Sequence, residues 1–153
     1  MKIKKIILVG LVLFLGGFMV YGGICKFLAP KIDALELVSK SNALLEAGKI
    51  TTLKKVLYIS GMKQTGYFWE LLGVCELVFG LLLFIPATRL VGVLLLFPIT
   101  LHILLFHVFL DFHEAGELAL TSGLFMANVL LVRWGNLLKL LVGEEIKSKQ
   151  LTF

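Results

Sequence analysis

Four side chains that can carry a proton or a strong hydrogen bond lie inside long apolar stretches of the sequence: Glu76, His102, His107 and Asn128. Ionisable groups are costly in a hydrocarbon environment, so each of them is a candidate for proton handling, ligand binding or helix–helix contact. We expect these four residues to contribute to a polar site buried among helices, with Lys26 and Glu70 at its rim.

Glu76 is the strongest candidate, because it lies deep in its apolar stretch and two glycines share its helical face. Gly73 and Gly80 are three residues before it and four residues after it, a spacing that places all three on one face. Such a face packs closely against another helix and buries the carboxyl group in protein. A histidine from residues 90–110 would be its partner. The pair would handle protons or orient a ligand; alternatively, Glu76 would only join two helices by a hydrogen bond.

The two histidines are five residues apart, about 140° around a helix, so they do not point at the same atom. This spacing disfavours both a haem site and a zinc site. His107 and Asp111 are four residues apart, which favours a histidine oriented by a local charge, and we expect no metal. Asn128 shares a rough face with Thr121, which is typical of a hydrogen bond between helices.

The motifs of common catalytic sites are absent from the sequence. Cys25 and Cys75 are fifty residues apart and form no CxxC motif, so neither a thiol redox pair nor a cysteine-built metal site is supported. No glycine-rich phosphate loop, HExxH motif or GxSxG motif occurs either. We therefore expect no stand-alone catalytic activity.

Composition indicates that membrane helices position these residues. Of the 153 residues, 59% are hydrophobic and 16% are charged, against about 45–50% and about 25% in soluble domains. A chain of this size cannot bury so much apolar surface by itself. The composition excludes a water-soluble enzyme, a disordered tail and a disulfide scaffold. The net charge of +5 indicates membrane orientation and anionic lipids rather than nucleic acid.

The apolar stretches predict an all-α fold, an integral membrane bundle of four transmembrane helices in one domain, 1–153. A hydrocarbon core of about 30 Å needs about 20 helical residues. The predicted spans are 6–26, 67–88, 90–110 and 118–138, and a polar tail follows at 143–153. Residues 27–65 combine apolar residues at helical spacing with lysines, which predicts an amphipathic connector in the membrane interface.

The first span is expected to remain uncleaved, because its apolar run of twenty residues exceeds the usual signal-peptide core. Its glycine pairs 10/17 and 16/23 are each seven residues apart, which predicts close-packed helix faces. Four spans place both termini on one side of the membrane. Lysine and arginine are almost evenly divided between the two sides, and the basic start of the chain favours cytoplasmic termini.

A group of residues recurs here in an order that is typical of one family. These residues are Gly22, Gly23 and Lys26 in the first span, then Glu76, Gly80 and the Leu81–Leu83 run, then Arg89, and last the HILLFHVFLD stretch with both histidines. With these residues the sequence, above all the stretch from Met62 to Asp111, resembles the DoxX-like family of small bacterial membrane proteins. The resemblance covers the first three spans well and the fourth weakly, and His102 stands where similar sequences often carry Asn.

This resemblance implies a four-helix bundle in the bacterial cytoplasmic (inner) membrane and a link to redox systems, since the family's namesake is a subunit of a quinone-linked oxidoreductase. We expect an accessory subunit of a quinone-linked or oxidative-stress redox system. Quinone is the one cofactor suggested, by resemblance alone. The expected partners are the lipid bilayer and either a redox protein or further copies of this chain. The alternatives are a small oligomeric transporter or channel, with Glu76, Asn128 and Lys26 facing one lumen, and a membrane assembly factor.

Overall fold

The computed structural model describes residues 2–30, 32–112 and 115–134, and these ranges form helices without any strand. The helices are α1 (Lys2–Leu28), α2 (Ala34–Glu46), α3 (Ile50–Gln64), α4 (Phe68–Leu82), α5 (Arg89–Leu110) and α6 (Ala115–Trp134). The predicted all-α fold is confirmed. The end of the predicted span 118–138 and the polar tail 143–153 lie outside the described residues.

Three helices, α1, α5 and α6, are long and apolar enough to cross a membrane. A fourth candidate span arises if α3 and α4, which meet at a bend of 88°, are counted as one broken span. The described residues therefore contain three to four candidate membrane spans. The first and third agree with the predicted stretches 6–26 and 90–110.

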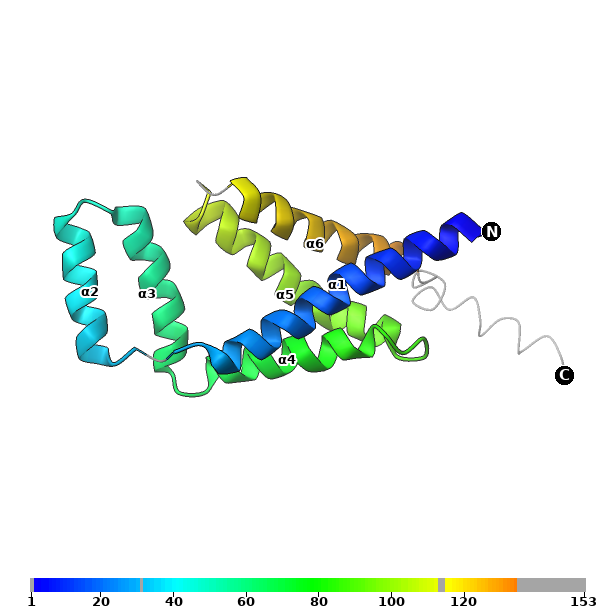
Figure 1. The fold of residues 1–153 in the computed structure, drawn as a ribbon, viewed down its shortest axis with the longest axis horizontal. Coiled ribbons are helices and arrows are strands. Elements are labelled where there is room, and N and C mark those ends of the chain that lie inside the picture. Colours follow the sequence, from blue (N-terminus) through cyan, green and yellow to red (C-terminus); the bar gives the residue numbers. More distant parts are fainter. Residues whose placement is uncertain (1, 31, 113–114, 135–153) are drawn as a thin grey trace, which may run out of the picture.

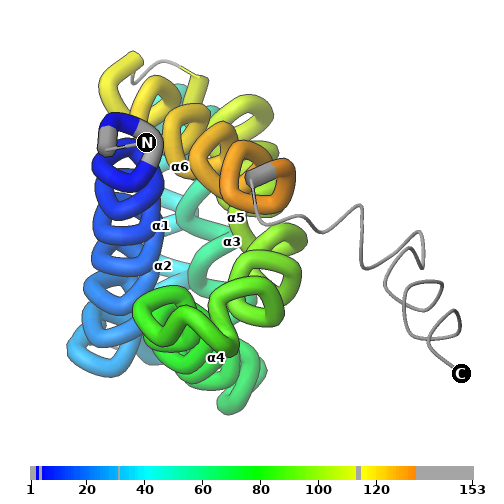
Figure 2. Tube along the Cα trace, turned by 90° about the vertical axis from the view of Figure 1, so that its right-hand side faces the viewer, coloured from blue at the N-terminus to red at the C-terminus, as the bar shows by residue number. Residues whose placement is uncertain are grey.

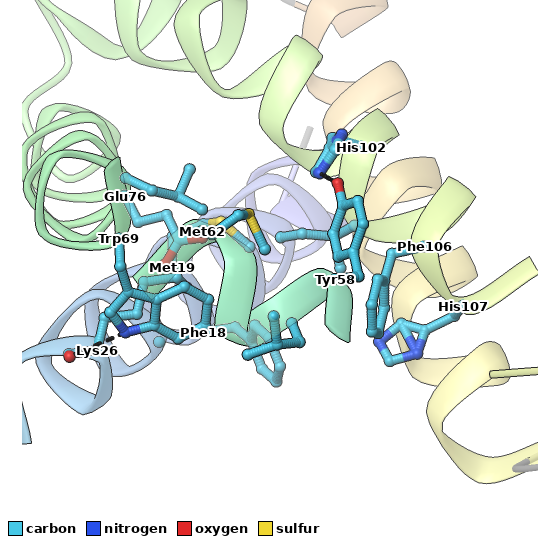
Figure 3. Close-up of a pocket in the computed structure, with 14 residues that line it drawn as sticks. Phe18, Met19, Lys26, Tyr58, Met62, Trp69, Glu76, His102, Phe106 and His107 are labelled. Atoms are coloured by element: carbon cyan, nitrogen blue, oxygen red, sulfur yellow. Dashed lines mark hydrogen bonds and ion pairs between the residues drawn. The ribbon is translucent and has the colours of Figure 1, made fainter. Parts of the chain in front are cut away.

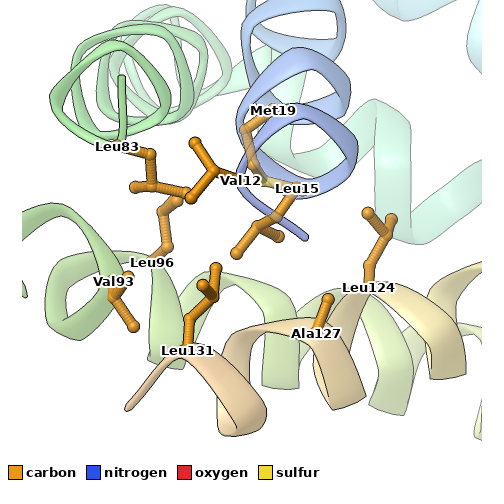
Figure 4. Close-up of a cluster of buried hydrophobic side chains, with 9 residues drawn as sticks. All are labelled: Val12, Leu15, Met19, Leu83, Val93, Leu96, Leu124, Ala127 and Leu131. Carbon is orange, nitrogen blue, oxygen red and sulfur yellow. The ribbon is translucent and has the colours of Figure 1, made fainter. Parts of the chain in front are cut away.

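The helices α1, α4, α5 and α6 pack in a ring in which each contacts two neighbours. Figure 2 shows α1 opposite α5, with α4 and α6 between them. Neighbouring helices run in opposite directions, so α1 begins at the end of the ring where α6 ends (Figure 1). Apolar side chains fill the centre of the ring (Figure 4): Val12, Leu15, Met19, Leu83, Val93, Leu96, Leu124, Ala127 and Leu131.

Glycines form the contact between α1 and α4. A Cβ atom on Gly23 would lie 2.7 Å from the carbonyl oxygen of Gly73, and one on Gly16 would lie 3.2 Å from that of Gly80. The two glycines of each helix are seven residues apart, so the same contact repeats after two turns of the antiparallel pair. The expected close-packed face is found on the 16/23 pair.

The other glycine pair of α1 makes no such contact. A Cβ atom on Gly10 or Gly17 would meet nothing within 4 Å. The predicted packing face at 10/17 therefore meets no other helix within the part of the chain that the structure describes. Seven-residue spacing places two glycines on one face, but it does not determine which face meets another helix.

The predicted span 67–88 is also corrected, because α4 ends at Leu82 and residues 83–88 form turns. Pro86 lacks a backbone N–H and disfavours helical geometry in the residue before it. The helix closes with tighter bonds, from Leu83 N to Gly80 O and from Phe84 N to Leu81 O. Two side chains then donate to carbonyl groups at its end: Thr88 Oγ1 to Leu82 O at 3.0 Å, and Arg89 Nε to Leu83 O at 2.8 Å.

Within the segment predicted as a connector, 27–65, residues 34–64 form the hairpin of α2 and α3. α2 begins after Asp33, whose side chain accepts a hydrogen bond from Ala34 N, and the hairpin turns at Gly48, where φ is +68°. α2 packs on α3 and has no buried residue, whereas α3 also contacts α4 and α5. α3 therefore packs against the ring instead of only linking two of its helices.

Candidate functional site

A cavity of about 230 Å³ lies between α1, α3, α4 and α5 (Figure 3). Two pairs of polar side chains lie at opposite ends of it: Lys26 and Glu76 beside Trp69 at one end, and Tyr58 and His102 at the other. His107 also lines the cavity. Since an apolar cavity of about 150 Å³ holds benzene, this one has room for a substituted aromatic ring. The other walls are apolar and include Phe18, Met19, Ile59, Met62, Leu72, Ile103 and Phe106.

The first polar end is an ion pair between α1 and α4. Lys26 Nζ lies 2.5 Å from Glu76 Oε2, and Glu76 is only 1% exposed. The same ammonium lies 5.3 Å from the centre of the Trp69 ring, whose Nε1 donates to Lys26 O at 3.1 Å. The carboxylate of Glu76 and the face of the Trp69 ring thus hold the ammonium of Lys26, and the hydrogen bond from Trp69 holds its backbone carbonyl.

The expected pairing of Glu76 with a histidine is therefore wrong. Its partner is Lys26, which was expected only at the rim of the site. The physical reason is the glycine contact between α1 and α4. Because Gly73 packs directly against Gly23, the helix face that carries Glu76 meets α1 and not α5.

The second polar end joins α3 to α5. Tyr58 Oη lies 2.6 Å from His102 Nε2, and the two rings are stacked with their centres 6.0 Å apart. Reasoning from the sequence missed Tyr58, because its segment was predicted to be an interfacial connector. The signal was present: Lys55, Tyr58, Ile59 and Met62 recur at helical spacing, so they share one face of α3.

His107 lines the cavity next to an ionic cluster. Its Nδ1 lies 3.8 Å from Asp111 Oδ2 and 3.7 Å from Glu117 Oε2. Ligand atoms of these three residues lie within 4.8 Å of one another, a spacing that fits a metal ion. Lys55 from α3 donates to Asp111 Oδ2 at 2.5 Å. Its ammonium supplies the positive charge that a metal ion would bring, so we interpret the cluster as an ionic contact between α3 and the end of α5.

The acidity of Asp111 gives a test of this contact. Burial raises the pKa of its carboxyl, but hydrogen bonding and the charge of Lys55 outweigh burial, so the pKa lies below its ordinary value. The stabilisation by ionised Asp111 is complete above the pKa in the unfolded chain, about 3.9. It is lost as the pH falls through the lower pKa of the folded protein.

We predict that Asp111→Asn lowers the free energy of unfolding by about 1 kcal/mol at pH 7. The difference from the wild type should shrink as the pH falls below about 3.9 and through the lower pKa of folded Asp111, because the wild-type side chain then becomes protonated and neutral like the asparagine. Thermal unfolding in detergent across this pH range measures it. Glu36→Gln, a change at an exposed acid of α2, is the control. A loss of unfolding free energy in Asp111→Asn that does not change with pH would contradict the ionic contact between Asp111 and Lys55.

Asn128 and Glu70 do not line this cavity. Asn128 is fully buried between α6 and α5, where its Nδ2 donates to Val93 O at 3.3 Å. Glu70 lies in the first turn of α4, where a negative charge is favourable for the helix. Among the described residues, Asn128 therefore does not share the cavity that Glu76 and Lys26 line, whereas the channel alternative places all three on one lumen.

No family model, no curated protein and no solved structure matches this chain at a significant level. The DoxX-like resemblance accordingly remains a prediction from the sequence.

The cavity has the size and lining of a small-molecule binding site. Its lining contains no Ser, Thr or Cys in the part of the chain that the structure describes, and Lys26 is engaged with Glu76. The cavity therefore has the Lys26 ammonium, a hydrogen-bond donor, at one end and the Tyr58–His102 pair at the other end. Apolar and aromatic side chains line the space between them. Such a set of side chains is chemically compatible with a flat apolar molecule that carries a polar group at each end.

Proposed function

We propose that this chain is a DoxX-like, four-span protein of the bacterial cytoplasmic membrane, and that it binds a quinone headgroup as an accessory subunit of a quinone-linked or oxidative-stress redox system. The arrangement of the cavity carries this proposal. A quinone headgroup is a flat ring with a carbonyl oxygen at each end. The Lys26 ammonium suits one carbonyl, the Tyr58–His102 pair suits the other, and the aromatic walls suit the ring.

The ring of antiparallel helices supports four spans, with α4 as the short one. Its 15 residues make about 22 Å of helix, and the turns at 83–88 extend its reach. α1 begins where α6 ends (Figure 1), and Lys5 and Arg133 are basic residues at this end. Lysine and arginine are almost evenly divided between the two ends, and the basic start of the chain favours the cytoplasm for this end. The cavity, at the opposite end of α1, would lie near the outer surface of the membrane.

Quinone binding can be measured through Trp69, which lines the cavity. The chain has two tryptophans, so Trp134→Phe leaves Trp69 as the only indole. A short-chain benzoquinone added to this variant in detergent should quench its fluorescence in a saturable manner. Quenching that rises linearly with quinone concentration, as it does for free indole in the same micelles, would contradict the proposal.

A side chain that fills the cavity should weaken quinone binding strongly. A Cβ atom on Gly22 would meet only Glu76 Oε2, at 3.4 Å, so Gly22→Leu can be accommodated and directs its side chain into the cavity. We predict that the dissociation constant for the quinone rises at least about tenfold, a loss of about 1.4 kcal/mol. Gly17→Leu is the matched control on the same helix, because Gly17 is exposed and a Cβ there meets nothing within 4 Å. Equal binding by the two variants would mean that the quinone binds elsewhere.

The accessory role needs a separate test. The chain purified from its own host in a mild detergent should carry a redox enzyme with it. The Gly22→Leu chain should retain this partner, since the outer faces of its helices are unchanged. Quinone-linked activity of the complex should fall in that variant, and recovery of the chain without any redox enzyme would contradict the accessory role.

A further inference from the structure

The carboxylate of Glu76 has one oxygen that the ion pair with Lys26 does not use. Oε2 accepts from Lys26 Nζ, whereas Oε1 is buried and has no hydrogen-bond partner among the residues that the structure describes. Leaving a buried acceptor without a donor costs about 1–3 kcal/mol, and more when the acceptor is charged. Such a group in a folded protein calls for an explanation.

The position of Glu76 indicates where the missing donor would come from. Glu76 lines the cavity, as do Gly22 opposite it and Lys26 beside it. A Cβ atom on Gly22 would lie 3.4 Å from Oε2, the other oxygen of this carboxylate, so the absence of a side chain on Gly22 leaves space on that side of the group. The neighbouring wall residues Phe18, Met19 and Leu72 have no polar hydrogen to offer. The remaining source is a molecule in the cavity.

The chemistry of a carboxylate then defines what this molecule must present. An ionised carboxylate is an acceptor only, and the lysine ammonium at Oε2 is a donor only. A ligand carbonyl against Oε1 would bring two acceptors together, whereas a ligand hydroxyl would donate to Oε1 and satisfy it. We propose that the cavity recognises a hydroxyl group on a flat, otherwise apolar ligand, a phenol or hydroquinone, through a hydrogen bond to Glu76 Oε1.

This inference rests on the proposed function of the cavity and narrows it. Of the two redox states of a quinone, the cavity should favour the reduced, hydroxyl-bearing one. A binding site with a buried acceptor that a ligand hydroxyl satisfies discriminates strongly against an analogue without the hydroxyl, because the acceptor is then left unpaired. The oxidised quinone still binds, with its carbonyl on Lys26, but more weakly.

Two probes that differ only in the hydroxyl group test the inference without redox chemistry: 4-hexylphenol and its methyl ether, 4-hexylanisole. Binding to the full chain in detergent is measured as the ligand-induced rise in melting temperature as a function of concentration. Gly22→Leu gives the background from partition into micelles. We expect the phenol to bind at least tenfold more tightly than the ether, and Glu76→Met to reduce this ratio to about one.

A second variant covers the outcome in which Glu76→Met does not fold. The double variant Lys26→Met, Glu76→Met replaces the whole buried pair by apolar side chains of similar length, which is often tolerated, and it should also bind both probes equally. Equal binding of the two probes by the wild type, above the Gly22→Leu background, would overturn the inference and leave the ring-binding cavity intact. Binding of neither probe above that background would overturn the cavity function itself.

Discussion

Lys26→Met should be one of the most destabilising single substitutions in this chain. It leaves the carboxylate of Glu76, which is 1% exposed, without its counter-charge inside the bundle. Removing one partner of a buried ion pair costs about 3–5 kcal/mol, because the remaining charge is neither paired nor hydrated. Unfolding of the purified protein by increasing SDS in mixed micelles measures the change in the free energy of unfolding.

The partner variants show whether the loss comes from the unpaired charge. Glu76→Gln in the Lys26→Met background removes that charge, so the double variant should be more stable than Lys26→Met alone. Lys40→Met, a change at an exposed lysine of α2, controls for the loss of one positive charge and should alter the free energy of unfolding by less than about 0.5 kcal/mol. A Lys26→Met protein as stable as this control would refute the buried pair.

Gly23→Ala should have the second largest effect, although it adds a single methyl group. The new Cβ would lie 2.7 Å from Gly73 O and 2.9 Å from Leu77 N. Both are backbone atoms of α4, so no side chain can turn away and the two helices must separate. Overpacking of this kind costs about 1–3 kcal/mol. Separation of α1 from α4 also lengthens the contact between Lys26 and Glu76, so quinone binding should weaken with stability.

Gly17→Ala is the matched control for this substitution. It is the same change in the same helix, at a position where a Cβ meets nothing within 4 Å. Alanine is the better helix former by about 0.5–1 kcal/mol, so this variant should be as stable as the wild type or slightly more stable. Equal melting temperatures for Gly23→Ala and Gly17→Ala would show that α1 and α4 do not meet at Gly23.

The sequence alone determined which segments are helical and approximately where they end. α1 and α5 agree with the predicted stretches 6–26 and 90–110, because a run of apolar residues and its bounding polar or proline residues act locally. The spacing of Gly73, Glu76 and Gly80 also placed these residues on one face correctly, since helical periodicity is a property of the segment itself. The prediction from the sequence was wrong for the end of α4, because the turn that contains Pro86 stops this helix at Leu82.

Only the tertiary structure decided which faces meet. The contacts that define the site join residues far apart in the chain: Lys26 with Glu76, Tyr58 with His102, and Lys55 with Asp111. Periodicity shows that a residue lies on a given face, but not which helix packs against that face. That choice depends on how closely two backbones can approach and on the shape of both surfaces. Gly23 against Gly73 turns Glu76 toward α1, and α3 packs against the ring and adds Tyr58 to the cavity.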